Sequence, residues 1–274
     1  MYKRILTIQD ISCIGQCSLT VALPILSACG LETAILPSAV LSTHTAFKEG
    51  YTFRDLTDDM PEILKHWQKK NFTFDAFYTG YLGSERQIEY VKQIFNSVGK
   101  EGSVRIVDPA MADNGKLYPG FDNAFVSSMA ELCKNADYII PNLTEACFMV
   151  NAEYKEKYDE AYIDSILAKL HELTDATVIL TGVSYDDNTT GVVTAANGNK
   201  EYYRHRKSPH SSHGTGDVFA SAFAGALVNG HTPYEAGKIA ADYTLSCIEH
   251  TAGDAEHWYG VKFEPLLGDL IKAL

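Results

Sequence analysis

The sequence lacks several features that would point to other classes of protein. No apolar run approaches the roughly 20 residues that cross a bilayer, so we expect no membrane contact. The formal net charge is −12, which argues against a nucleic-acid surface, because such a surface needs clustered lysine and arginine to displace phosphate counterions. None of the six cysteines is paired as C-x-x-C, so neither a zinc ribbon nor a thioredoxin-type motif is expected.

The N-terminus also makes a poor secretory signal. Gln9 and Asp10 interrupt the apolar stretch that follows the basic start. We therefore expect a cytoplasmic protein with free thiols, because disulfides are rare in that compartment. Cys13 and Cys17 are the only two cysteines that fall near the substrate end predicted below.

Short apolar runs alternate with helical patterns along almost the whole chain. The expected strands cover residues 4–9, 33–37, 76–79, 104–107, 138–140 and 177–180. The expected helices cover residues 19–29, 60–69, 85–98, 124–134 and 162–173. Because several strands are uninterrupted apolar runs, they suit a parallel sheet that is buried on both faces. The alternation predicts an α/β fold of the doubly wound type, with a mostly parallel central sheet and helices on both faces.

The pattern changes after the last of these strands. Asn197-Gly198 separates two extended runs, 191–195 and 201–206, which predicts an antiparallel hairpin at an edge of the sheet. Helices are expected at 217–229 and 233–249, with a final short helix from residue 265. No repeat, low-complexity segment or linker interrupts the chain, so we expect one domain over residues 1–274.

The segment His213-Gly214-Thr215-Gly216-Asp217 carries the strongest chemical signal. Its two glycines let backbone N–H groups approach a ligand closely, and the helix that follows adds free donors and a partial positive charge. This arrangement predicts an anion hole that needs no lysine. Asp217 would lie where a carboxylate can accept a proton from an attacking hydroxyl. Taken alone, the same residues also suit an ordinary turn and helix cap.

With its other landmarks, the chain resembles the ribokinase-like kinases, and more closely the pyridoxal/pyridoxamine kinases. The landmarks occur in the family's order over nearly the full length: Ile8-Gln9, Ser42-Thr43-His44-Thr45, Thr79-Gly80-Tyr81, Val107-Asp108-Pro109, Pro141-Asn142-Leu143-Thr144-Glu145, Thr181-Gly182 and Gly214–Asp217. The resemblance implies a ribokinase-like fold and a homodimer. It also implies ATP-dependent phosphorylation of the 5′-hydroxymethyl group of a B6 vitamer, in pyridoxal 5′-phosphate salvage.

The resemblance assigns roles to particular residues. It implies that Asp217 is the catalytic base, and that Gly214, Thr215 and Gly216 form the catalytic anion hole and help to bind the nucleotide. Further nucleotide contacts are implied for a second set: Asp113, Asn142, Thr181 and Gly182.

The implied metal is Mg²⁺, held by Asn142 and Glu145 with Asp108 nearby. These residues follow strands 104–107 and 138–140, and open α/β sheets bind ligands beyond the carboxyl ends of their strands. Mg²⁺ prefers oxygen ligands and keeps several waters. Asn142 and Glu145 also suit the start of a helix, and the two roles are compatible. Whether a monovalent cation is also needed is left open.

The acceptor side of the site is assigned to Asp10, His44, Thr45 and Tyr81. Asp10 stands where the family usually has serine, and a carboxylate there favours a cationic vitamer such as pyridoxamine. The competing interpretation is that Asp10 caps the turn at Ile11-Ser12. Likewise, His44 suits a structural histidine as well as a substrate contact.

Four other functions compete with a vitamin kinase. Another ribokinase-like small-molecule kinase, such as a sugar kinase, usually carries Gly-Gly-x-x-Asn near the N-terminus, and the residues before Thr20 do not offer it. Hydroxymethylpyrimidine kinases share the fold, but they typically follow Gly-Thr-Gly with cysteine, whereas this chain has Asp217. A dinucleotide oxidoreductase would need G-x-G-x-x-G after the first strand, and residues 10–18 contain only Gly15. A vitamin-binding protein without activity would have no need of the base.

Overall fold

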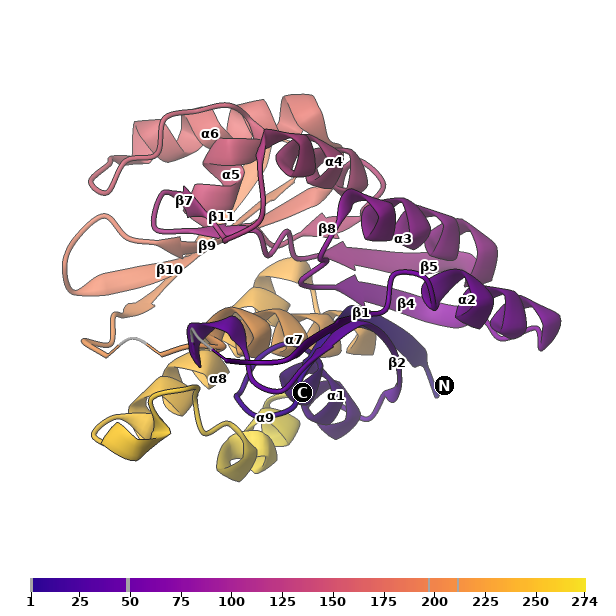
Figure 1. The fold of residues 1–274 in the computed structure, drawn as a ribbon. Coiled ribbons are helices and arrows are strands. Elements are labelled where there is room, and N and C mark those ends of the chain that lie inside the picture. The colour runs from indigo at the N-terminus through magenta and orange to yellow at the C-terminus, as the bar shows by residue number, and fades with distance from the viewer. Residues whose placement is uncertain (1, 48–49, 197, 211) are drawn as a thin grey trace.

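A computed structural model describes residues 2–47, 50–196, 198–210 and 212–274. Its main element is a nine-stranded sheet in the order β11-β10-β9-β8-β5-β4-β1-β2-β3 (Figure 1). The strands are β1 (Arg4–Ser12), β2 (Glu32–Leu41), β3 (Phe53–Asp55), β4 (Phe74–Thr79), β5 (Gly99–Val107), β8 (Tyr138–Ile139), β9 (Thr177–Val183), β10 (Thr189–Ala196) and β11 (Asn199–Arg206). Two short strands, β6 (Ala112–Asp113) and β7 (Lys116–Leu117), form a separate ribbon.

The core of this sheet is parallel. Strands β2, β1, β4, β5, β8 and β9 pair in parallel, whereas β3 and the β10–β11 pair are antiparallel at the two edges. The predicted edge hairpin is therefore confirmed in its two strands, while Asn197 of its turn lies outside the described residues. Parallel neighbours bring the carboxyl ends of β1, β4 and β5 to one edge of the sheet, where ligands bind in this kind of fold.

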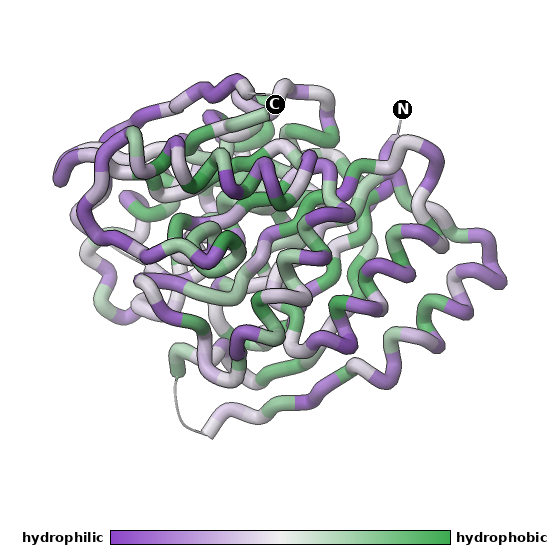
Figure 2. The backbone as a smooth tube through the Cα atoms, turned by 90° about the horizontal axis from the view of Figure 1, so that it is seen from above, coloured by the Kyte–Doolittle hydropathy of each residue, from purple (hydrophilic) through white to green (hydrophobic). Residues whose placement is uncertain are grey.

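Helices cover both faces of the sheet, as the alternating pattern predicts. One face packs against α2 (Met60–Lys69), α3 (Glu85–Val98), α4 (Asn123–Cys133), α5 (Leu143–Met149) and α6 (Glu160–Leu173). The other packs against α1 (Leu19–Ala28), α7 (Thr215–Asn229), α8 (Pro233–Thr251) and α9 (Leu267–Ala273). Hydrophobic residues concentrate along the inner strands and hydrophilic ones along the outer helices (Figure 2).

Adjacent strand residues alternate between the two cores. On β1, Ile5 belongs to the α1/α7 side and Leu6 to the α2/α3 side, and both are fully buried. The small residues of α7 let it approach α1 closely, since a Cβ at Gly225 would lie 2.4 Å from Cys29 Sγ. Helices α1 and α7 therefore pack directly against each other on this face of the sheet.

A few short elements were absent from the sequence prediction. Strand β3 is exposed along its length and therefore shows no alternation of apolar and polar residues. Strands β6 and β7 have only two residues each, and α5 has seven, which are too few for a clear period. None of the described helices is long and apolar enough to cross a membrane.

Candidate active site

The start of α7 is built as an open anion site. Gly214 precedes it with φ of 76°, in the left-handed region that glycine alone adopts easily. A Cβ at Gly214 would lie 1.7 Å from the Gln16 carbonyl oxygen, so the loop after β1 also requires glycine here. No described side chain caps α7, and its first N–H groups are therefore available to an anion. Beside Gly216 the space is open to beyond 4 Å.

Asp217 lies in the first turn of α7, partly exposed and close to two other carboxylates. Desolvation is the main cause that raises its pKa to about 8, and the charges of Asp108 and Asp10 add to it. A hydrogen bond from the Ser18 backbone acts in the opposite direction. Burial and the neighbouring Glu145 charge raise the pKa of Asp108 well above its ordinary value. Burial also raises the pKa of Glu145 to about 7. Desolvation and mutual repulsion disfavour the ionised form of each of these acids. Such a group suits a site where a bound cation balances the negative charges.

Glu145 and Asn142 close the start of α5 as a capping box. Asn142 Oδ1 accepts a hydrogen bond from the Glu145 N–H at 3.0 Å, and Glu145 Oε2 accepts one from the Asn142 N–H at 2.9 Å. The other oxygen, Oε1, accepts bonds from the N–H groups of Met111 at 3.0 Å and Ala112 at 3.5 Å. The capping role considered from the sequence is therefore confirmed, and it ties the loop after β5 to α5.

These residues fit a cation that keeps its own water. Among the described residues, no three histidine, cysteine or acidic side chains converge closely enough to ligate a metal together. Mg²⁺ typically binds through one or two carboxylates and retains several waters. The carboxylates of Asp108 and Glu145, with no basic side chain among the main causes of their pKa shifts, supply the charge that such an ion requires.

Replacing Glu145 with alanine should destabilise the protein as well as affect any bound metal. Three backbone N–H groups, of Met111, Ala112 and Asn142, would lose their acceptor in a buried place. We expect the free energy of unfolding to fall by about 3 kcal/mol, measured by chemical denaturation. Glu131→Ala, which removes an exposed acid on α4, should change it by less than about 0.5 kcal/mol. A loss below about 1 kcal/mol for Glu145→Ala would show that the capping bonds contribute little.

On the acceptor side, Asp10 lies at the end of β1 and is 5% exposed. Its Oδ2 accepts a hydrogen bond from Ser12 Oγ at 3.0 Å. Desolvation raises its pKa, while hydrogen bonds from Ser18 and Ser12 and the positive form of His44 act against that rise. Burial and the Asp10 charge together raise the pKa of Tyr81 to about 12. The structure thus brings Asp10, Tyr81 and His44 together, and Asp10 binds its own turn through Ser12 while its charge also acts on Asp217.

His44 has no ring nitrogen left for a ligand. Its Nδ1 accepts a hydrogen bond from the Ala46 N–H at 3.2 Å, so the proton lies on Nε2, which donates to the Tyr259 carbonyl at 2.7 Å. Burial lowers its pKa, which is consistent with a neutral ring. His44 is 6% exposed, whereas the next residue, Thr45, is exposed at the start of a 3₁₀ turn (Thr45–Phe47).

The predicted nucleotide residues lie next to the acid group. Thr181 pairs with Asn142 across neighbouring backbones, and its N–H donates to the Pro141 carbonyl at 3.0 Å. Gly182 is exposed, with φ of 71° and no atom that a Cβ would meet. Asp113 is also exposed and close enough to Glu145 to raise its pKa. The structure therefore gathers the segments after β5 and β8 and the end of β9 at the same edge as α7.

Several residues at this edge were not predicted from the sequence. Ser18, at φ of 56°, starts α1 and reaches both Asp10 and Asp217. Tyr118 is 37% exposed and lies near Glu145, Asp113, Asp108 and Asp217; desolvation and these charges raise its pKa. Cys17 lies between Asp10 and Asp217, where burial and the two charges raise its thiol pKa so that it stays protonated. Unlike Ser18 and Tyr118, this cysteine was already expected near the substrate end from the sequence.

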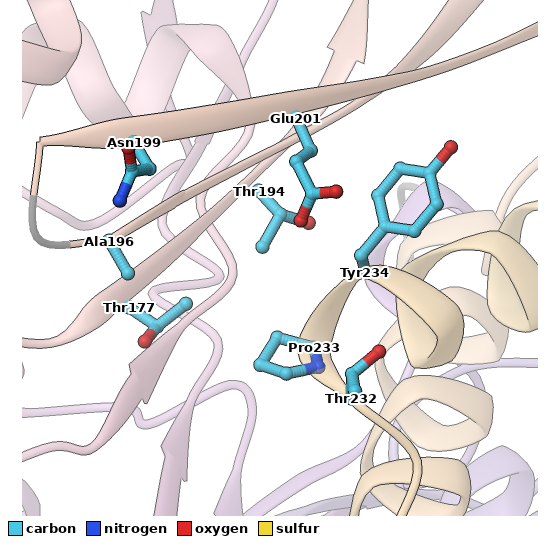
Figure 3. Close-up of a pocket in the computed structure, with 8 residues that line it drawn as sticks. All are labelled: Thr177, Thr194, Ala196, Asn199, Glu201, Thr232, Pro233 and Tyr234. Carbon is cyan, nitrogen blue, oxygen red and sulfur yellow. The ribbon is translucent and has the colours of Figure 1, made fainter.

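A separate cavity of about 290 Å³ opens at the opposite edge of the sheet. It lies between the β10–β11 hairpin and the start of α8, and its walls include Thr177 at the beginning of β9 (Figure 3). Thr194, Glu201 and Tyr234 also line it, and no residue of the predicted site does. The candidate active site is therefore distinct from this cavity.

A parallel sheet with an open helix start beside a partly exposed carboxylate of raised pKa is typical of a kinase of the ribokinase-like class. The sequence model of the phosphomethylpyrimidine kinase family matches residues 51–261, so the chain belongs to this family. A curated pyridoxal kinase of Dictyostelium discoideum is 26% identical over 242 residues, which cover 82% of this chain and 78% of that protein. The resemblance stated from the sequence is thus confirmed.

Solved structures give the same result. A Bacteroides thetaiotaomicron protein, provisionally named a phosphomethylpyrimidine kinase, superposes with a TM-score of 0.93 at 36% identity, over 98% of this chain and 94% of that one. The pyridoxal kinase of Lactobacillus plantarum has a TM-score of 0.92 at 29% identity, over 99% and 98% of the two chains. The predicted ribokinase-like fold is confirmed.

Proposed function

We propose that the protein transfers the γ-phosphoryl group of ATP to the 5′-hydroxymethyl group of a B6 vitamer. One observation carries the proposal: Asp217, with a pKa raised to about 8, sits in the first turn of an uncapped helix and next to Asp10 of the acceptor pocket. The Dictyostelium relative is a pyridoxal kinase, and the Bacteroides protein was also solved with pyridoxal, at 36% identity. The proposed phosphoryl acceptors are therefore pyridoxal, pyridoxine and pyridoxamine.

In this proposal Asp217 acts as the general base. Its carboxylate accepts the proton of the vitamer hydroxyl while the oxygen attacks phosphorus. The N–H groups at Gly214–Asp217 bind the oxygens of the transferred group, where negative charge spreads in the transition state. A base whose pKa lies near the working pH combines a useful deprotonated fraction with a strong affinity for the proton. Thr181 and Gly182 border the nucleotide side.

Asn142, Glu145 and Asp108 would hold Mg²⁺ near the phosphates, through water. Bound there, the ion would supply positive charge next to Asp108 and Glu145, whose pKa shifts have no basic side chain among their main causes. Asp113 is exposed and lies close to Glu145. After Asp217, Asp108 and Glu145, it is the fourth acid whose charge the ion would balance.

The acid group predicts a pH-dependent effect of Mg²⁺ on stability. The folded protein without metal binds protons at Asp217 and Glu145 more tightly than the unfolded chain does, with pKa values of about 8 and 7 against 3.8 and 4.5. Stability should therefore fall as the pH rises from about 4 to about 8, and Mg²⁺ should restore it. We expect MgCl₂ to raise the melting temperature more at pH 8 than at pH 5.5, by about 2–4 °C per kcal/mol restored.

The comparison uses NaCl of equal ionic strength as its control. In Asp217→Asn the difference between the two pH values should shrink, because one of the shifted acids is gone. An equal effect of MgCl₂ at both pH values would mean that the ion does not bind this acid group.

The nearest competing function is phosphorylation of hydroxymethylpyrimidine, since the matching family is named for it. Asp217 at the position where such kinases typically have cysteine favours a B6 vitamer. A panel of acceptors separates the two: we expect kcat/KM for the preferred vitamer to exceed that for hydroxymethylpyrimidine and for ribose by at least about 100-fold. A pyrimidine that equals the best vitamer would reject the proposal.

Asp10 should set the preference among vitamers. Its carboxylate, at the end of β1, favours the aminomethyl cation of pyridoxamine over the neutral aldehyde of pyridoxal, and an opposite charge at about 4 Å contributes on the order of 1–4 kcal/mol before desolvation. We expect pyridoxamine to be at least as good a substrate as pyridoxal, and Asp10→Ser to shift kcat/KM toward pyridoxal by about 10-fold. If the ratio stays the same, the carboxylate serves only the turn to Ser12.

The single domain, the homodimer and the cytoplasmic location stay predictions. So does the absence of a nucleic-acid partner, which the net charge of −12 continues to support.

A further inference from the structure

The segment after α8 brings an exposed tryptophan to the catalytic edge. Trp258 is 50% exposed, and its ring centroid lies 4.6 Å from that of Phe47. His213 and His44 flank it at 6.4 and 6.5 Å, both edge-on. His213 immediately precedes Gly214, so the indole stands beside the start of α7. Half of the Trp258 surface is therefore open to a molecule bound at this helix start.

The backbone next to Trp258 is fixed to the site by three contacts. The Tyr259 carbonyl accepts the hydrogen bond from His44 Nε2 at 2.7 Å. A Cβ at Gly260 would lie 2.4 Å from Gln16 Cβ, and Gln16 Nε2 donates to Glu264 at 2.6 Å. The same Gln16 presses its carbonyl against Gly214. The loop after β1 is thus held between the anion hole on one side and residues 258–264 on the other.

These contacts also explain what His44 does. With both ring nitrogens bonded within the protein, it cannot donate to a ligand or accept from one. Its ring instead joins residues 44–47 to residues 258–259, with Phe47 at 5.0 Å. This arrangement leaves the half-exposed Trp258 indole 6.5 Å from the His44 ring, beside the segment that carries Thr45.

We propose that Trp258, supported by Phe47, forms the outer wall of the acceptor pocket and packs against the planar ring of the vitamer. The inference rests on the proposed function, and it makes Trp258 a specificity-determining residue for that reaction. Ring-to-ring packing favours flat aromatic acceptors over sugars without using a hydrogen bond. It also gives a role to the C-terminal segment, which the sequence had left without one.

Kinetics of Trp258→Ala test this directly. We expect KM for pyridoxal to rise about 10-fold while KM for ATP stays within about twofold, and Trp258→Phe to restore most of the loss. The matched control is Trp67→Phe, which changes the second of the two tryptophans, on α2 against Phe74 at 5.6 Å. That variant should keep the KM for pyridoxal. A KM for pyridoxal that is unchanged in Trp258→Ala would overturn the inference.

A binding measurement gives the same answer without turnover. Protein labelled with 5-fluorotryptophan has one ¹⁹F resonance for each tryptophan, and Trp67→Phe assigns them. Pyridoxal alone should shift the Trp258 resonance and leave the Trp67 resonance in place. If the protein phosphorylates pyridoxal normally but the Trp258 resonance does not shift, the role of Trp258 is rejected and the proposed function stands. A protein that phosphorylates no vitamer would instead reject the proposed function, and this inference with it.

Discussion

Replacing Asp217 with asparagine should lower kcat by about 10²–10⁴-fold while ATP affinity changes little. The amide keeps the shape of the carboxylate but cannot accept the proton of the attacking hydroxyl. ATP affinity should survive because the N–H groups at the start of α7 belong to the backbone, and Gly214 rather than Asp217 sets their direction. Initial rates and ATP binding by calorimetry measure the two effects separately.

The same variant should be more stable than the wild type at pH 8. The wild-type carboxylate is raised to a pKa of about 8 by burial and by Asp108, so its ionised form is costly there, and the neutral amide removes that cost. Asp269→Asn, which changes an exposed acid on α9, is the matched control and should alter neither property. A fall in kcat of less than about 10-fold would mean that another group is the base.

The second large effect is expected at Gly214. In Gly214→Ala the new methyl group would meet the Gln16 carbonyl at 1.7 Å, and the residue would keep a φ of 76° that alanine adopts poorly. We expect a loss of about 2–4 kcal/mol in the free energy of unfolding from strain and overpacking. Because the loop and the helix start would move apart, kcat/KM should also fall by at least about 100-fold, the size of effect that follows loss of one anion-hole donor.

Gly216→Ala is the matched control for this change. No atom lies within 4 Å of a Cβ there, so the fold should accept the methyl group, and the helix should gain about 0.5–1 kcal/mol. The methyl group would instead occupy the open space over the first turn, so KM for ATP should rise by about 10-fold. Thermal unfolding and ATP kinetics of both variants separate a fold requirement from a ligand requirement. Equal losses of stability would contradict the open space beside Gly216.

Much of the fold follows from local pattern. The apolar runs at 4–9 and 104–107 mark strands β1 and β5, and the run of small residues after Asp217 marks α7, because burial on both faces leaves a strong signal. The carboxyl-edge position of Asp108, Asn142 and Glu145 follows from parallel pairing alone. Strand β3 gave no such signal, since its three residues are exposed.

The remaining site depends on contacts between distant parts of the chain. The bond from His44 to the Tyr259 carbonyl joins residues 215 positions apart, and neither residue type predicts it. The fit of Gln16 against Gly214 is a backbone contact, which composition does not encode. Ser18 has a positive φ of 56° and bonds to Asp10 and Asp217, which are 8 and 199 positions away along the chain. Such features become visible only when the fold is assembled.

The central claim is that phosphate from ATP is transferred to the 5′-hydroxyl of a B6 vitamer under the control of Asp217. The most direct measurement incubates the wild type and Asp217→Asn with MgATP and each vitamer, and identifies the product by mass and ³¹P NMR. The account predicts a vitamer 5′-phosphate from the wild type, one for each ATP consumed, and a rate at least about 100-fold lower from the variant. ATP consumption without a 5′-phosphorylated vitamer, or an equal rate from Asp217→Asn, would contradict it.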